Sequence, residues 1–217
     1  MDAKRTNDLS GHVLYIPKVI PEANSIFTRL QEGVQWQEIM WRQGRKLPRL
    51  CAPSIWLTSE IGMLLHAWVR EFFLCSYDVN VTISDIFANY YRNGNDYLPH
   101  HRDQYDDLHV VSLSFGATRT FSFQPSVQKG VTPSGNEKSK GIPRSFELAE
   151  GDIIVFDPYI NQHYTHGIAK QPGVKTGRIN LTCFVRFDKL PYGLPRLEGE
   201  VITPSEIMVR AILQGMK

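Results

Sequence analysis

The sequence predicts a mainly β fold with supporting helices, arranged as a double-stranded β-helix, or jelly-roll, barrel. Several segments rich in β-branched and aromatic residues have the character of strands. The clearest helical patterns come before most of these segments, and one late strand alternates apolar and polar residues except at Phe184. Many strands preceded by a few helices are typical of a barrel that helices cover on one side.

Two helices are expected in the N-terminal part of the chain. Pro21 opens a short helix that ends near Leu30, because proline is favoured at the first helical position. A longer helix begins near Ser59, and its apolar residues recur at helical spacing, so we expect them to face the core. These residues are Ile61, Leu64, Leu65, Trp68, Phe72 and Cys75.

Strands are expected at 82–91, 109–115, 119–124, 151–156 and 178–187. In the last of them the two faces differ. Ile179, Leu181, Cys183, Val185 and Phe187 share one face, and Arg178, Asn180, Thr182, Phe184 and Arg186 share the other. The polar face either lines a cavity or meets solvent, and the alternation alone allows both.

Two segments outside this core carry weaker signals. Residues 126–144 are polar, basic and broken by Gly and Pro, which predicts a long hairpin loop that is either solvated or a contact for a phosphate backbone. The residues Thr203-Pro204-Ser205-Glu206 have the form of a capping box with proline at the first helical position. This pattern predicts a terminal helix that packs against the barrel or against another subunit.

Length and composition indicate a single soluble domain. We expect 1–80 to hold helices and a substrate lid, 81–188 the catalytic barrel, and 189–217 an extension with a helix. No signal peptide or membrane span is expected, and the three cysteines are too dispersed for a disulfide framework. We expect a monomer in a reducing intracellular compartment, cytoplasm or nucleus. The formal net charge of +2 means that any nucleic-acid binding depends on local patches.

His101 and Asp103 are the strongest candidates for metal ligands. Side chains two residues apart in a strand project from the same face, so both can reach one ion while Arg102 points away. His100 has Arg102 at its second position and is expected to be a neighbour only. Two imidazoles and one carboxylate form the ligand set that holds a non-haem Fe(II) and leaves positions open for O2 and a co-substrate.

The third ligand has to come from a distant part of the chain, where His163 and His166 are the two candidates. We favour His166, because Gly167 lets the backbone turn closely past a metal site. His163 is then a surface histidine or a neighbour of the site. Further on, Arg178 offers a planar guanidinium, which is suited to a bidentate grip on a dicarboxylate co-substrate.

Five linked segments resemble the AlkB family of Fe(II)/2-oxoglutarate dioxygenases, which dealkylate nucleic acids. They are Asn89-Tyr-Tyr91-Arg-Asn-Gly, His101-Arg-Asp103, the run from Val111 to Phe121, Thr165-His166-Gly and Arg178-Ile-Asn-Leu-Thr182. The resemblance extends from about Ile86 to Phe187. It implies Fe(II) as cofactor, with 2-oxoglutarate and O2 as co-substrates.

The resemblance also implies a role for individual residues. His101, Asp103 and His166 would be the iron ligands and thus the catalytic centre. Arg178 would hold the distal carboxylate of 2-oxoglutarate. The further contacts of the co-substrate would be Asn89, Tyr91, Asn180 and Thr182.

The chain departs from the family pattern at two positions. Phe184 stands where the family usually has a second Arg that holds the end of 2-oxoglutarate nearer the iron, and Arg186 on the same face is the candidate replacement. Tyr105 stands where dealkylases of the family commonly have an acid that helps to read the damaged base. Asp106 or Asp107 is either a substitute for that acid or a solvated loop charge.

A basic and aromatic stretch runs from Trp41 to Arg49. Single-stranded nucleic acid is held by such mixtures of cations and stacking rings, so Trp41, Arg42 and Arg45 are candidate substrate contacts. The opposing interpretation is that a tryptophan here belongs to the core.

The leading hypothesis is oxidative dealkylation of N-alkylated bases in DNA or RNA, with succinate, CO2 and an aldehyde as products. The alternative is a 2-oxoglutarate oxygenase that acts on a protein side chain or a small molecule, which Tyr105 and the modest charge favour. A third hypothesis, a non-enzymatic jelly-roll binding module, is favoured by Phe184 in place of the second Arg.

Overall fold

The computed structural model describes residues 9, 11–40, 44, 46–126 and 143–188 of the chain. The strands of this part are β1 (Val13–Ile16), β2 (Gln37–Met40), β3 (Lys46–Ala52), β4 (Val81–Tyr91), β5 (Leu98–His101), β6 (His109–Gly116), β7 (Arg119–Pro125), β8 (Arg144–Leu148), β9 (Ile153–Phe156), β10 (Tyr164–Ile168) and β11 (Arg178–Phe187). The helices are α1 (Ala23–Gly33), α2 (Ile55–Thr58), α3 (Glu60–Tyr77) and α4 (Pro158–His163).

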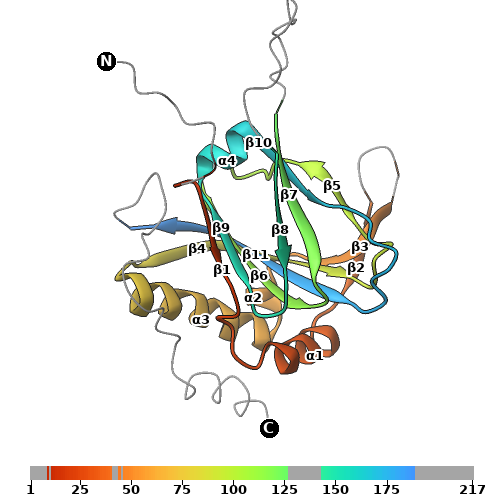
Figure 1. The fold of residues 1–217 in the computed structure, drawn as a ribbon. Helices are drawn as coiled ribbons and strands as arrows, with labels where there is room; N and C mark the ends of the chain where they lie inside the picture. The colour runs from red at the N-terminus through yellow and green to blue at the C-terminus, as the bar shows by residue number, and fades with distance from the viewer. Residues whose placement is uncertain (1–8, 10, 41–43, 45, 127–142, 189–217) are drawn as a thin grey trace, which may run out of the picture.

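The strands form two antiparallel sheets that pack face to face (Figure 1). The larger sheet has the strand order β1-β9-β6-β11-β4-β3-β2, and the smaller has the order β5-β10-β7-β8. Neighbours in each sheet are mostly distant in the chain: β11, the last described strand, lies between β6 and β4. This pair of sheets is a jelly roll, so the predicted fold class is confirmed.

Helices α1, α2 and α3 lie on the outer face of the larger sheet (Figure 1). The expected helix near Ser59 is α3, and the Ser59 hydroxyl caps it by accepting the N–H of Gly62. Trp68 and Phe72 of α3 are buried in a cluster with the apolar side chains of α1 and the sheet. This cluster forms the larger part of the core.

The expectation that Cys75 faces the core is wrong. Val69 and Phe73 are buried beside Trp68 and Phe72, so the buried stripe of α3 turns toward them in its second half. Cys75 is therefore exposed, and its thiol donates a hydrogen bond to the carboxylate of Glu71 at 3.2 Å.

Strand β11 separates the two halves of the core, as its alternation predicts. One face, with Ile179, Leu181, Cys183, Val185 and Phe187, packs in the helix-side cluster. The other face points between the sheets, where Arg178, Asn180, Thr182 and Phe184 line a cavity. A second apolar cluster surrounds this cavity and includes Phe121, Phe123 and Phe156. The polar face of β11 therefore lines a cavity from Arg178 to Phe184, and Arg186 at the end of the same face is exposed.

The structure tests some of the remaining expectations only in part. Strands β7 and β8 pair antiparallel, as the two arms of the expected hairpin do, but residues 127–142 of its loop lie outside the described residues. The expected C-terminal helix also lies outside them. Cys51, Cys75 and Cys183 are free thiols, as expected. Within the described part of the chain, no helix has the length and apolar character needed to cross a membrane.

Candidate active site

The pairing of β10 with β5 brings two candidate ligands together. In this antiparallel ladder His166 lies directly opposite His101, and the two ring centroids are 4.5 Å apart. A Cβ atom at Gly167 would lie 2.7 Å from the carbonyl oxygen of Leu98. Only glycine therefore permits this close approach of the two strands beside the site.

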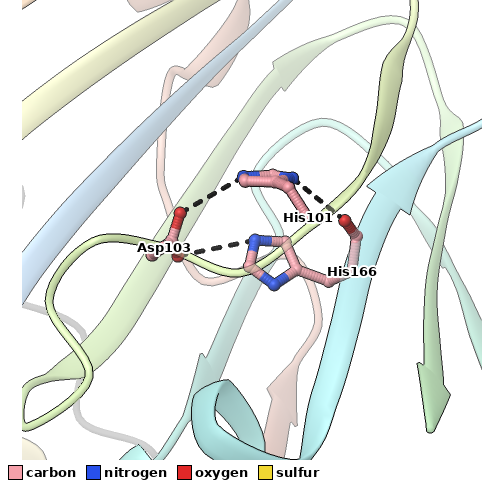
Figure 2. Close-up of side chains that lie close together, drawn as sticks. All are labelled: His101, Asp103 and His166. Atoms are coloured by element: carbon pink, nitrogen blue, oxygen red, sulfur yellow. Dashed lines mark hydrogen bonds and ion pairs between the residues drawn. The ribbon is translucent and has the colours of Figure 1, made fainter. Parts of the chain in front are cut away.

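The side chains of His101, Asp103 and His166 converge on one point (Figure 2). Nε2 of His101 lies 3.3 Å from Oδ1 of Asp103, and Nε2 of His166 lies 3.4 Å from Oδ2 of the same carboxylate. One ligand atom of each residue lies within 4.8 Å of the other two. Among the described residues, this is the one group of His, Cys, Asp and Glu that can hold a metal ion.

The protonation of both histidines suits metal binding. Nδ1 of His101 lies 3.1 Å from the carbonyl oxygens of Pro99 and of His166, so it is the protonated nitrogen and leaves Nε2 free for a metal. Burial lowers the pKa of His166 to about 4, although the charge of Asp103 opposes this shift. His166 is therefore neutral at physiological pH, which is the form that binds metals.

Asp103 is ionised and held in place by Asn161 of α4. Burial opposes its ionisation, but the close contacts of the carboxylate with His101 and His166 outweigh burial and lower its pKa. The side-chain oxygen of Asn161 accepts the backbone N–H of Asp103 at 2.8 Å, and its amide donates to the carbonyls of Asp103 and Tyr105. Asn161 has no distinguishing pattern in the sequence, but it is fully buried and fixes the backbone of a metal ligand.

Replacement of Asn161 by Ala should loosen the Asp103 segment and lower the affinity for Fe(II) roughly tenfold, because groups that orient a ligand contribute about 10-fold to 100-fold to metal affinity. Anaerobic Fe(II) titration measures this change. The neighbouring variant Gln162→Ala is the matched control, since Gln162 is exposed and its side chain donates, among the described residues, to the Asp106 carbonyl. Equal affinities of the two variants would show that Asn161 has no such role.

The donor set fits a ferrous ion. Oδ2 of Asp103 is buried and has no hydrogen-bond donor among the described residues. A buried acceptor without a partner costs about 1–3 kcal/mol, and a bound cation beside the carboxylate removes that cost. Two neutral imidazole nitrogens and one carboxylate, all on one side of the site, are the ligands of a non-haem Fe(II) centre.

The metal site opens into a cavity of about 250 Å³ between the two sheets. At its inner wall Arg178 is fully buried, and its Nη2 donates to the hydroxyl of Ser114 at 3.0 Å. Its Nε and Nη1 have no hydrogen-bond partner among the described residues, and neither has the buried hydroxyl of Tyr91. Burial lowers the pKa of Arg178 to about 10, so the guanidinium stays charged at neutral pH. These unpaired donors are suited to a carboxylate.

The other predicted co-substrate contacts form one hydrogen-bond network beside Arg178. Asn89 donates to the side-chain oxygen of Asn180 at 3.2 Å, and the hydroxyl of Thr182 donates to the same oxygen at 3.1 Å. The amide of Asn180 in turn donates to the hydroxyl of Ser112. Ser112 and Ser114 were not singled out in the sequence, although their alternation on β6 places both on the cavity side.

Two predicted residues lie away from the cavity wall. Arg186 is exposed at the end of β11, where its Nη2 forms an ion pair with Asp107 at 3.0 Å. The structure thus does not bring Arg186 to the co-substrate cavity. Asp106 is also exposed, and its described contact is the hydrogen bond that its carbonyl accepts from Gln162. Trp41, Arg42 and Arg45 lie outside the described residues.

The two departures from the family pattern meet in space. The ring of Tyr105 packs against the ring of Phe184, with centroids 4.6 Å apart. At these positions the family usually has an acid and an Arg, so an aromatic pair replaces two opposite charges.

The remaining histidines near the site do not join the metal cluster. His100 is exposed, and its Nε2 lies 3.1 Å from the hydroxyl of Ser122. His163 stacks on Tyr159 of the same helix, with ring centroids 4.2 Å apart. Both positions agree with the preference for His101 and His166.

Comparison with known proteins gives the same class of protein. Residues 12–183 match the family model described as the 2OG-Fe(II) oxygenase superfamily. Over 105 residues the chain is 30% identical to the DNA oxidative demethylase ALKBH2 of Homo sapiens, which is 46% of this chain and 39% of that protein. Over 106 residues it is 29% identical to the alpha-ketoglutarate-dependent dioxygenase alkB homolog 3 of Homo sapiens, which is 46% of this chain and 36% of that protein. The match thus spans less than half of these relatives.

Solved structures share the fold. The structure of OsALKBH1 is similar with a TM-score of 0.51 and 16% identity, over 80% of this chain and 97% of that chain. The alpha ketoglutarate dependent epimerase SnoN is similar with a TM-score of 0.53 and 10% identity, over 82% of this chain and 79% of that chain.

Fold and site together define an oxygenase class whose members use Fe(II), 2-oxoglutarate and O2. The chain belongs to the 2OG-Fe(II) oxygenase superfamily. The resemblance to its AlkB family, first indicated by five short segments, is confirmed by the two human relatives above.

Proposed function

We propose that this protein removes N-alkyl groups from nucleobases in DNA or RNA by oxidative dealkylation. One observation supports the proposal most: His101, Asp103 and His166 converge at the cavity whose wall holds the unpaired guanidinium of Arg178. The similarity to a DNA oxidative demethylase supports the choice of substrate class.

In this proposal the chain binds and orients the reactants. The two imidazoles and the carboxylate hold Fe(II), and Arg178 with the Tyr91 hydroxyl binds the distal carboxylate of 2-oxoglutarate. When bound, iron with 2-oxoglutarate and O2 supplies the oxidation of a C–H bond, and 2-oxoglutarate leaves as succinate and CO2. An N-alkyl carbon that gains a hydroxyl group in this way releases an aldehyde and leaves N–H on the base.

The cavity wall suits an extruded base. An alkyl group inside a paired duplex cannot reach a buried metal, so the base has to leave the stack or come from a single strand. Phe184 lines the cavity and Tyr105 packs on it, which provides an aromatic surface near the metal. Stacking of a base on such a surface contributes about 1–3 kcal/mol.

The test is to incubate the Fe(II)-loaded protein with DNA and RNA oligomers that carry methylated bases, single-stranded and double-stranded. We expect loss of the methyl group by mass spectrometry, with equal amounts of formaldehyde and succinate. Asp103→Ala should give neither product. Turnover of 2-oxoglutarate in the wild type without any demethylated base would reject the proposed substrate.

The Tyr105–Phe184 pair also favours a second candidate, a protein side chain or small molecule as the substrate, because the acid that helps to read the damaged base is absent. Salt distinguishes the two. Binding of nucleic acid falls steeply as salt increases, whereas binding of a neutral small molecule does not.

A further inference from the structure

A second buried guanidinium faces the cavity from β3. Arg49 is only 7% exposed and lines the same cavity as Arg178. In the antiparallel register Leu50 pairs with Tyr90, so Arg49 is next to Tyr91, which pairs with Arg178 on its other side. Arg49 and Arg178 thus flank Tyr91 in one row across β3, β4 and β11.

The head of Arg49 reaches along the cavity toward the Phe184 end of β11. Its Nε donates to the side-chain oxygen of Asn89 at 2.6 Å, and Asn89 pairs with Asn180, two residues closer to Phe184 than Arg178 is. Nη1 of Arg49 is buried and has no hydrogen-bond partner among the described residues. A donor of this kind, on a buried cation, calls for an anion.

The carboxylates that line the cavity have other partners. Asp103 lies between the two imidazoles. Asp85 accepts hydrogen bonds from the Ser54 hydroxyl and from the N–H of Ile86. In the described part of the chain, no ion pair joins Arg49 to a carboxylate. The charge of Arg49 acts on Asp103 and helps to lower the pKa of that carboxyl, but no described carboxylate bonds to the buried Nη1, which leaves this donor for an anionic ligand.

The site also lacks a cation where the family pattern has one. Phe184 occupies the position of the second Arg and packs against Tyr105, and Arg186 is turned to the surface toward Asp107. Arg49 is too buried to contact the phosphate backbone of a nucleic acid, because a polymer cannot enter a cavity of about 250 Å³. A small dicarboxylate can enter it.

We propose that Arg49 is the second guanidinium of the 2-oxoglutarate site and binds the carboxylate nearer the iron, in place of the Arg that Phe184 replaces. The inference rests on the proposed function only in taking 2-oxoglutarate as the co-substrate. Arg178 and Arg49 then hold the two ends of one dicarboxylate from the two sides of Tyr91 on the larger sheet.

The test is calorimetric titration of the Fe(II)-loaded protein with 2-oxoglutarate in the absence of O2, so that binding is measured without turnover. Arg49→Met should weaken binding about 10-fold to 100-fold, as expected for the loss of a charge-assisted hydrogen bond. Arg70→Met, which removes an exposed cation from α3, is the matched control and should bind as the wild type does.

A rescue variant separates this role from a structural one. Tyr105→Glu with Phe184→Arg restores the acid and the Arg of the family pattern, and in the Arg49→Met background it should recover at least about tenfold in affinity. Arg49→Lys keeps the charge but loses the planar fork that bonds to Asn89. It should bind 2-oxoglutarate at least about fivefold more tightly than the neutral Arg49→Gln, and this pair carries the test if Arg49→Met does not fold.

Three outcomes would overturn the inference. The first is wild-type affinity in Arg49→Met, and the second is equal affinity of Arg49→Lys and Arg49→Gln. The third is that Arg186→Met loses 2-oxoglutarate binding while Arg49→Met retains it. A wild-type protein that does not bind 2-oxoglutarate at all would instead reject the proposed function, and so the two failures are distinguishable.

Discussion

Asp103→Ala should abolish both iron binding and 2-oxoglutarate turnover. The carboxylate lies between the two imidazoles, at 3.3 Å and 3.4 Å from their Nε2 atoms. Its loss therefore leaves only the two neutral imidazoles to bind the cation. Ligand orientation alone contributes about 10-fold to 100-fold to metal affinity, and the loss of a ligand should exceed that. Iron content after anaerobic gel filtration, with succinate formation, measures both effects.

The fold of Asp103→Ala should survive. The hydrogen bonds between the Asn161 side chain and the backbone of residue 103 do not involve the carboxylate, so they remain in the variant. Glu32→Ala, which removes an exposed acid from α1, is the control and should retain iron and turnover. Retention of stoichiometric iron by Asp103→Ala would show that the metal binds elsewhere.

Arg178→Met should weaken 2-oxoglutarate binding by about 100-fold or more and leave iron binding unchanged. The guanidinium has two unpaired donors, and a bidentate contact with a carboxylate is among the stronger polar contacts in proteins. Because Arg178 is a buried cation that forms no ion pair with a described residue, its removal should not lower the melting temperature of the ligand-free protein.

Titration with 2-oxoglutarate without O2, and thermal melting of the ligand-free protein, check the two halves of this prediction. Arg70→Met again controls for the loss of one positive charge. A variant Arg178→Met that melts much earlier but binds 2-oxoglutarate normally would make Arg178 a structural residue.

Sequence patterns predict the parts of this site that depend on local spacing. The two-residue period of a strand separates the two faces of β11. It also singles out His101 and Asp103, although β5 ends at His101 and Asp103 follows it. The structure adds the pairing of β5 with β10, which sequence spacing does not give because the two strands are distant in the chain.

The residues that the sequence analysis missed depend on tertiary packing. The stretch from Trp41 to Arg49 is a candidate nucleic-acid contact by its cations and its aromatic residue, whereas the structure places Lys46–Ala52 in β3 with Arg49 buried. Asn161 lies in a short helix without a periodic pattern, and its role appears only when α4 packs against the Asp103 segment.

The prediction that Arg186 replaces the Arg missing at Phe184 shows what the two-residue alternation of a strand cannot predict. Alternation correctly places residue 186 on the face of Arg178, but the register of β11 with β4 shifts after Phe184, and the strand extends past the cavity. Arg186 therefore meets solvent and Asp107. The alternation predicts on which face of the strand a residue lies. The length of the barrel determines which residues of that face lie in the cavity.

The most direct measurement is a crystal structure of the protein with Mn²⁺ in place of Fe(II) and with 2-oxoglutarate. Anomalous scattering should give one metal peak bonded to His101, Asp103 and His166, and the distal carboxylate of 2-oxoglutarate should lie on Arg178. A metal peak elsewhere, or a dicarboxylate that does not contact Arg178, would contradict the account.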